Sequence, residues 1–151
     1  MKVLFICVEN SCRSQIAEGF GRQLGLQAES AGIKSGSGVN PDAVTVMAEI
    51  GIDISAQFSK AIEYEKLSDY DAVISMCSVK TGDICPSTFV ATQANWSIED
   101  PKGQPLKVFR RVRDEIRNKV AELARFKVSV KKDNAGQPGT GSGNIREVKD
   151  R

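Results

Sequence analysis

Short apolar runs alternate along the chain with segments in which apolar residues recur every three or four positions. The uninterrupted runs, which are typical of buried parallel strands, cover residues 3–6 and 72–76, and weaker extended segments cover 27–31 and 93–98. Helical periodicity covers residues 14–25, 41–50, 61–67 and 106–126. Strands that alternate with helices predict an α/β fold, a three-layer open sheet of about four parallel strands flanked by helices.

The C-terminal segment lacks this pattern. Residues 127–151 contain six basic and three acidic residues and a run rich in glycine and polar residues. Such a composition predicts a flexible, polar, basic tail after a folded domain of residues 1–126. We expect this tail to be solvated chain without a binding role.

Composition excludes several classes of function. The chain has 151 residues and no histidine, so a Ser-His-Asp triad, a Cys-His pair and a histidine-based zinc site are all impossible. A net charge of +2 argues against a nucleic-acid partner. Because no segment is a signal peptide or a membrane span, we expect a cytoplasmic protein that does not bind membranes. Stable disulfides are uncommon there, so its four cysteines are structural, metal-binding, catalytic or redox-active.

The loop after the first predicted strand carries the strongest chemical signal. Cys7 is followed by five residues, then Arg13 and Ser14, at the start of a predicted helix. Such a loop directs successive backbone N–H groups at one point and forms an anion site, here from residues Val8, Glu9, Asn10, Ser11, Cys12, Arg13 and Ser14. Arg13 can bind two oxygens of a tetrahedral oxyanion, and the same dipoles and Ser14 would stabilise a Cys7 thiolate without a histidine. The alternative is a buried structural cysteine followed by a capping serine.

This loop resembles the phosphate-binding loop of the low-molecular-weight protein tyrosine phosphatase superfamily. Further matching segments are Ser14–Glu18, Ser30–Gly32, Gly51–Ser55 and Glu99–Pro101, so the resemblance extends over residues 1–126. Within the superfamily the chain is more similar to the arsenate reductases than to the phosphatases. The phosphatases usually have tyrosines after the Asp-Pro pair, where this chain has Lys102-Gly103.

The resemblance implies a sequence of reactions on arsenate, with phosphate or sulfate as other oxyanions that could bind. Cys7 would attack arsenic, and Asp100, otherwise an ordinary loop residue, would be the general acid. Cys77 would then attack Cys7 and release arsenite, and Cys85 would attack Cys77. Thioredoxin or a glutathione/glutaredoxin system would reduce the resulting disulfide. The seven residues between Cys77 and Cys85 are about one more than in the thioredoxin-coupled subgroup, which leaves the reductant open.

Other interpretations of the cysteines remain open. Cys77 and Cys85 could be incidental loop residues, or all four cysteines could bind zinc, although their spacing is unlike that of usual zinc ligand pairs. Cys12 is expected to be structural, or to form a protective disulfide with Cys7.

The resemblance also bears on metals. Some of these reductases bind potassium beside the loop through an asparagine, a serine and two further oxygen-bearing side chains. Asn10 and Ser30 match the first two, but Phe58 and Lys60 stand where the others are expected. We therefore predict no metal site and no cofactor. The ammonium of Lys60 would replace the cation, or Lys60 is simply an exposed lysine.

The function predicted from the sequence is therefore that of a monomeric arsenate reductase with weak phosphatase side activity. The first alternative is a phosphatase that uses only Cys7, Arg13 and Asp100. The second is a non-catalytic oxyanion-binding or redox-sensing protein, which would not use Asp100.

Overall fold

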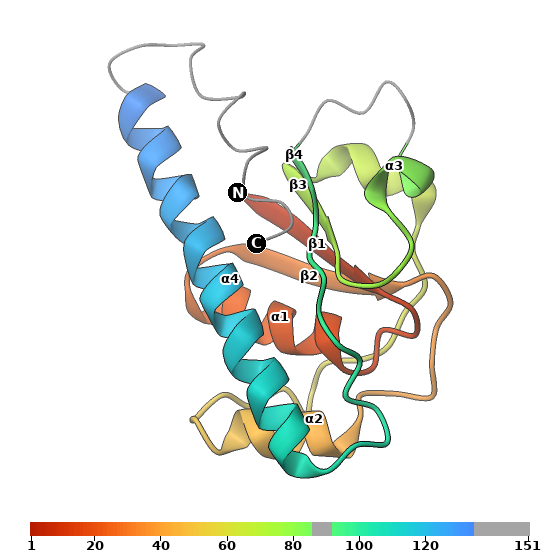
Figure 1. The fold of residues 1–151 in the computed structure, drawn as a ribbon. Helices are drawn as coiled ribbons and strands as arrows, with labels where there is room; N and C mark the ends of the chain where they lie inside the picture. The colour runs from red at the N-terminus through yellow and green to blue at the C-terminus, as the bar shows by residue number, and fades with distance from the viewer. Residues whose placement is uncertain (86–91, 135–151) are drawn as a thin grey trace.

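A four-stranded parallel sheet forms the centre of the computed structural model, which describes residues 1–85 and 92–134 (Figure 1). The strands are β1 (Lys2–Cys7), β2 (Gln27–Gly32), β3 (Ala72–Ser75) and β4 (Thr92–Asn95), in the order β2-β1-β3-β4. Residue 6 of β1 pairs with residue 31 of β2 and with residue 75 of β3. The α/β sheet predicted from the apolar runs is confirmed.

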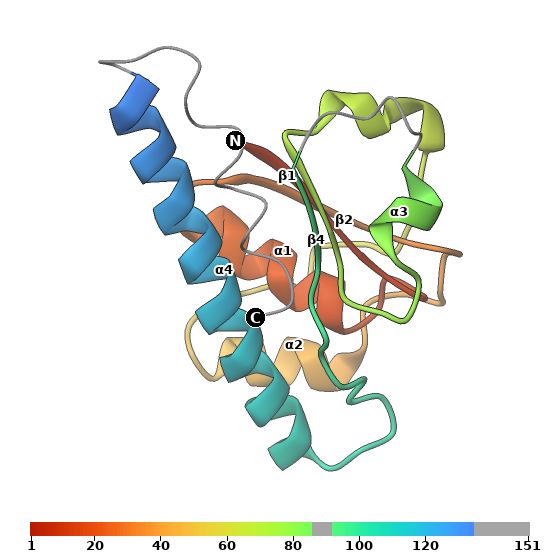
Figure 2. The same cartoon turned by 45° about the horizontal axis from the view of Figure 1, so that its top comes forward.

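Helices cover both faces of the sheet (Figures 1 and 2). The helical elements are α1 (Arg13–Gln23), α2 (Pro41–Ala48), the 3₁₀ helix η1 (Tyr64–Asp69), α3 (Thr81–Ile84) and α4 (Leu106–Asn134). Side chains alternate along β1, so Val3 and Phe5 pack into a core with α1, α2 and α4. Leu4 and Ile6 point the other way, into a smaller core with η1 and α3.

Two boundaries differ from the prediction. The helical periodicity predicted no helix between residues 77 and 89, but this segment contains α3, whose four residues are too few to show a helical period. The last helix was expected to end at residue 126, but α4 continues to Asn134, because the first helix-breaking residues after it are Gly136 and Pro138. Residues 127–134 are therefore helical. Residues 135–151 and 86–91 lie outside the described residues, and the division into a domain and a tail stays a prediction.

The fold places the candidate residues at one edge of the sheet. Cys7 is the last residue of β1, and Cys77 lies two residues after the end of β3. Because these strands are parallel neighbours, both cysteines lie at the edge formed by their carboxyl ends. Asp100 lies beyond the end of β4, on the segment that leads into α4. Within the described residues, no helix is long and apolar enough to cross a membrane.

Candidate active site

The backbone of the loop between β1 and α1 is turned so that its carbonyl groups face away from the centre of the loop. The carbonyls of residues 7–11 accept hydrogen bonds from Ile33 N, Lys34 N, Gly36 N, Ser59 Oγ, Gln15 Nε2 and Asn40 N, at 2.9–3.1 Å. In a trans peptide plane the next N–H points opposite to the carbonyl. The N–H groups of residues 8–12 therefore point inward, as an anion site requires.

Asn10 holds this loop in shape. Its φ angle is 55°, in the left-handed region that asparagine tolerates better than most residues. Its buried side chain accepts a hydrogen bond from Lys60 N at 2.9 Å and donates one to Ser14 Oγ at 2.8 Å. This second contact fixes the position of the Ser14 hydroxyl.

The Ser14 hydroxyl lies directly against the Cys7 sulfur. The distance from Ser14 Oγ to Cys7 Sγ is 2.8 Å, and both residues are buried. Because Asn10 Nδ2 already donates to Oγ, the hydroxyl can direct its own proton at the sulfur. A thiolate at Cys7 would therefore receive one hydrogen bond from Ser14, and it lies at the N-terminal end of α1.

Arg13 joins the loop to the ends of the other strands. Arg13 is 7% exposed, and its Nη1 donates to the carbonyls of Met76 at 2.6 Å and Ile98 at 3.0 Å. Its Nη2 lies 3.8 Å from Asp100 Oδ2. The guanidinium is thus fixed on one side and presents Nη2 to the same space as Asp100.

A hollow of about 220 Å³ is formed where these groups meet. Its lining residues are Cys7, Val8, Glu9, Ser11, Cys12, Arg13, Asp100 and Lys102. Asn10 and Ser14 do not line the hollow, because their side chains are fully buried beside it. Burial raises the pKa of the Cys12 thiol to about 11, so this cysteine stays protonated at neutral pH. A thiol, a guanidinium cation and a carboxyl group therefore line the same hollow.

The other two cysteines lie in different surroundings. Cys77 is partly exposed and lines a second hollow of about 250 Å³, which shares Arg13 with the first hollow. Its Sγ lies 3.5 Å from Ser75 Oγ. Cys85 is buried in the smaller core, and burial raises its pKa. All four cysteines are free thiols.

Comparison with known proteins agrees with this geometry. The family model for "low molecular weight phosphotyrosine protein phosphatase" matches residues 2–135. The chain belongs to this family.

Two curated relatives are similar over most of their length. A glutaredoxin arsenate reductase from Synechocystis sp. is 46% identical over 127 residues, which cover 81% of this chain and 95% of that protein. An arsenate reductase from Bacillus cereus is 43% identical and covers 81% of this chain and 92% of its own. A solved structure described as an arsenate reductase in the phosphate binding state superposes with a TM-score of 0.74 at 44% identity, covering 83% of this chain and 98% of that one.

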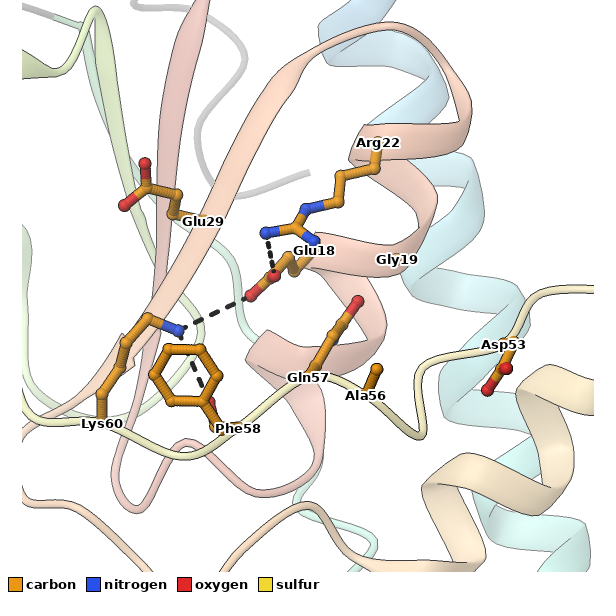
Figure 3. Close-up of a pocket in the computed structure, with 9 residues that line it drawn as sticks. All are labelled: Glu18, Gly19, Arg22, Glu29, Asp53, Ala56, Gln57, Phe58 and Lys60. Carbon is orange, nitrogen blue, oxygen red and sulfur yellow. Dashed lines mark hydrogen bonds and ion pairs between the residues drawn. The ribbon is translucent and has the colours of Figure 1, made fainter.

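The carboxylate of Glu18 lines a third hollow, of about 350 Å³ (Figure 3). Glu18 is 2% exposed and accepts a hydrogen bond from Ser30 Oγ at 2.5 Å, and its other oxygen lies 2.6 Å from Arg22 Nη2. Lys60 Nζ lies 3.9 Å from Glu18 and donates to Phe58 O at 3.4 Å. Burial lowers the pKa of Lys60 below its usual value, and the attraction of the Glu18 carboxylate offsets only part of this shift. An ammonium group thus lies next to the carboxylate behind the loop, and its role in place of a metal cation stays a prediction.

Sequence reasoning missed two residues of this site. Lys102 lines the hollow and forms an ion pair with Glu9, but in the sequence it is one lysine in a loop. Gly32 lies so close to the loop that an added Cβ would be 2.8 Å from Val8 O and 2.9 Å from Asn10 N. The segment Ser30–Gly32 was noted for its resemblance, but only the pairing of β1 with β2 shows why a glycine is needed there.

Proposed function

We propose that this protein reduces arsenate to arsenite with a relay of three cysteines. The observation that carries the proposal is that Arg13 lines both hollows, the one that contains Cys7 and the one that contains Cys77. Arg13 also binds the carbonyl of Met76, the residue before Cys77. The similarity to proteins named arsenate reductase supports the same activity.

In the first step, the Cys7 thiolate attacks the arsenic of an arsenate held by the inward N–H groups and by Arg13. A sulfur–arsenic bond forms and an arsenic–oxygen bond breaks. Asp100, next to Arg13 Nη2, gives its proton to the departing oxygen, which leaves as water. Arsenic is still in the oxidised state after this step.

In the second step, the Cys77 thiolate attacks the sulfur of Cys7. A Cys7–Cys77 disulfide forms, the sulfur–arsenic bond breaks, and its electron pair stays on arsenic, which leaves as arsenite. Cys85 then attacks Cys77, which gives a Cys77–Cys85 disulfide and returns Cys7 as a thiolate. Because Cys85 is buried in the smaller core, this attack requires the segment around α3 to rearrange.

An external thiol reductant completes the cycle by reducing the Cys77–Cys85 disulfide. Thioredoxin and glutathione with glutaredoxin are the two candidates, and the similarity to the Synechocystis enzyme supports the second. We place this chemistry in the cytoplasm, where such reductants are kept reduced.

The experiment is a coupled assay of NADPH consumption with arsenate, run once with thioredoxin and its reductase and once with glutathione, glutaredoxin and glutathione reductase. Wild-type protein should turn over in one of the two systems. Cys77→Ser should lose arsenate turnover but keep hydrolysis of an aryl phosphate, which needs Cys7, Arg13 and Asp100 alone. Cys85→Ser should stop with a Cys7–Cys77 disulfide, visible by mass spectrometry. Repeated arsenate turnover by Cys77→Ser would refute the relay.

The second candidate is phosphatase activity as the main function, because the same three residues can pass a phosphoryl group to water. Membership of a phosphatase family favours this candidate. Efficient ester hydrolysis with no arsenate turnover in either coupled system would decide for it.

A further inference from the structure

An ion pair connects the two sides of the hollow above Cys7. Glu9, on the loop after β1, and Lys102, on the segment before α4, are far apart in the sequence, yet Oε1 and Nζ lie 2.7 Å apart. Both residues line the hollow that contains Cys7 and Arg13. The pair therefore links the anion-binding loop to the segment that carries Asp100.

The exposed fractions place this pair at the opening of the hollow. Cys7 and Arg13 are 3% and 7% exposed, whereas the side chains of Glu9 and Lys102 are 33% and 54% exposed. The hydrogen bond between the two lowers the pKa of Glu9 and raises the pKa of Lys102, so both are charged at neutral pH.

Backbone hydrogen bonds hold both residues of the pair in place, Glu9 in the anion-binding loop and Lys102 beside Asp100. The backbone carbonyl of Glu9 is fixed by Gly36 N at 3.0 Å and by Ser59 Oγ at 2.9 Å. The backbone N–H of Lys102 donates to Asp100 Oδ1 at 3.1 Å. The ion pair is therefore held in a defined place relative to the nucleophile and the acid.

The leaving group of an attacked oxyanion lies opposite the sulfur, in line with it. With Cys7 at the buried end, that direction runs past Asp100 towards the opening, where the ion pair lies. When the substrate is a bare oxyanion, the leaving group is a single oxygen that fits beneath the pair. When it is an organic ester, the organic group extends towards the opening, where Glu9 and Lys102 lie.

We propose that the Glu9–Lys102 ion pair selects bare tetrahedral oxyanions over organic esters and phosphonates at this site. This inference rests on the proposed function only in that an oxyanion binds between Cys7 and Arg13; it does not depend on arsenate reduction. Separating an exposed ion pair costs little, so the selection should amount to about threefold to fivefold in relative affinity.

The test measures how well two anions protect Cys7 from alkylation by iodoacetamide, with modified Cys7 quantified by mass spectrometry. Inorganic phosphate is the bare oxyanion, and phenylphosphonate is the bulky analogue. In the wild-type protein, phenylphosphonate should need a concentration about threefold to fivefold higher than phosphate for half protection. In Glu9→Gln/Lys102→Gln, which removes the pair without changing the net charge, the ratio should fall towards one.

Two further variants complete the design. Lys102→Arg keeps a cation that can pair with Glu9, so it should keep the wild-type ratio. Glu63→Gln/Lys66→Gln removes an exposed ion pair of 3.0 Å at the start of η1, whose two residues do not line the hollow, and should also keep the ratio. High salt screens exposed charges, so it should lower the ratio in the wild-type protein itself, a measurement that needs no variant.

The outcomes separate the two proposals. Equal protection by both anions in the wild-type protein, or the same ratio in wild type and double variant, would overturn the selection by the ion pair. If neither anion protects Cys7, the oxyanion site of the proposed function is wrong, and this inference falls with it.

Discussion

Replacement of Ser14 by alanine should greatly reduce the reactivity of Cys7. Ser14 Oγ lies 2.8 Å from Cys7 Sγ in a buried position, and the hydroxyl is held there by Asn10 Nδ2, also at 2.8 Å. A hydrogen bond to a charged group contributes about 1.5–3 kcal/mol. Because about 1.4 kcal/mol is a factor of ten, the rate of Cys7 alkylation should fall by roughly tenfold to a hundredfold.

The same substitution has a separate effect on stability. In Ser14→Ala, Asn10 Nδ2 loses its acceptor while it stays buried, and an unsatisfied buried donor costs about 1–3 kcal/mol. The free energy of unfolding should fall by this amount. The two effects are measured independently, one by chemistry at Cys7 and one by urea titration.

The assay is the rate of Cys7 alkylation by iodoacetamide at pH 7 on folded protein, with circular dichroism to verify the fold. Ser68→Ala, a substitution of an exposed serine on η1, is the matched control and should keep the wild-type rate. A Ser14→Ala protein that is folded and alkylated at the wild-type rate would refute the role given to the hydroxyl.

Three other predictions follow from single contacts. Gly32→Ala would place a Cβ 2.9 Å from Asn10 N, so it should lower the free energy of unfolding by about 1–3 kcal/mol and abolish arsenate turnover; an unchanged urea midpoint would contradict this. Burial raises the pKa of Cys12 from 9.0 to about 11, so the contribution of its protonated thiol to stability is complete below pH 9 and is lost as the pH rises to 11. Between pH 9 and 11 the free energy of unfolding should therefore fall less in Cys12→Ala than in the wild-type protein. Equal losses in the two proteins would argue against a buried thiol at this position. Because Lys60 Nζ lies 3.9 Å from Glu18, turnover and the thermal unfolding midpoint should be the same with potassium or sodium as the only cation; strong stimulation by potassium would show that Lys60 does not replace it.

Most secondary structure could be predicted because it depends on local pattern. The apolar runs of β1 and β3, the helical period of α1 and α2 and the start of α4 are visible in the sequence within a few residues of their observed bounds. The exceptions have physical reasons. Helix α3 is a single turn of four residues, and α4 passes its predicted end because no glycine or proline stops it there.

The candidate site, too, could be predicted only where its residues are neighbours in the sequence. Cys7, Arg13 and Ser14 could be recognised because they are neighbours on one strand–loop–helix segment, so their order in the chain sets their order in space. Asp100 is 87 residues from Arg13 in sequence, but Oδ2 and Nη2 are 3.8 Å apart. Its role was predicted from the resemblance to a family, since spacing alone did not distinguish it from other loop residues.

The sequence by itself determined the fold class, the position of Cys7 at the end of the first strand and the absence of any histidine beside it. The tertiary structure decided what surrounds that cysteine: the outward carbonyls, the Asn10–Ser14 contact, the close approach of Gly32 and the Glu9–Lys102 ion pair. The physical reason is the parallel sheet. Each parallel strand returns to the same edge only after a long crossover, so residues that meet at this edge are separated by tens of positions in the chain. Only the paired strands bring them together.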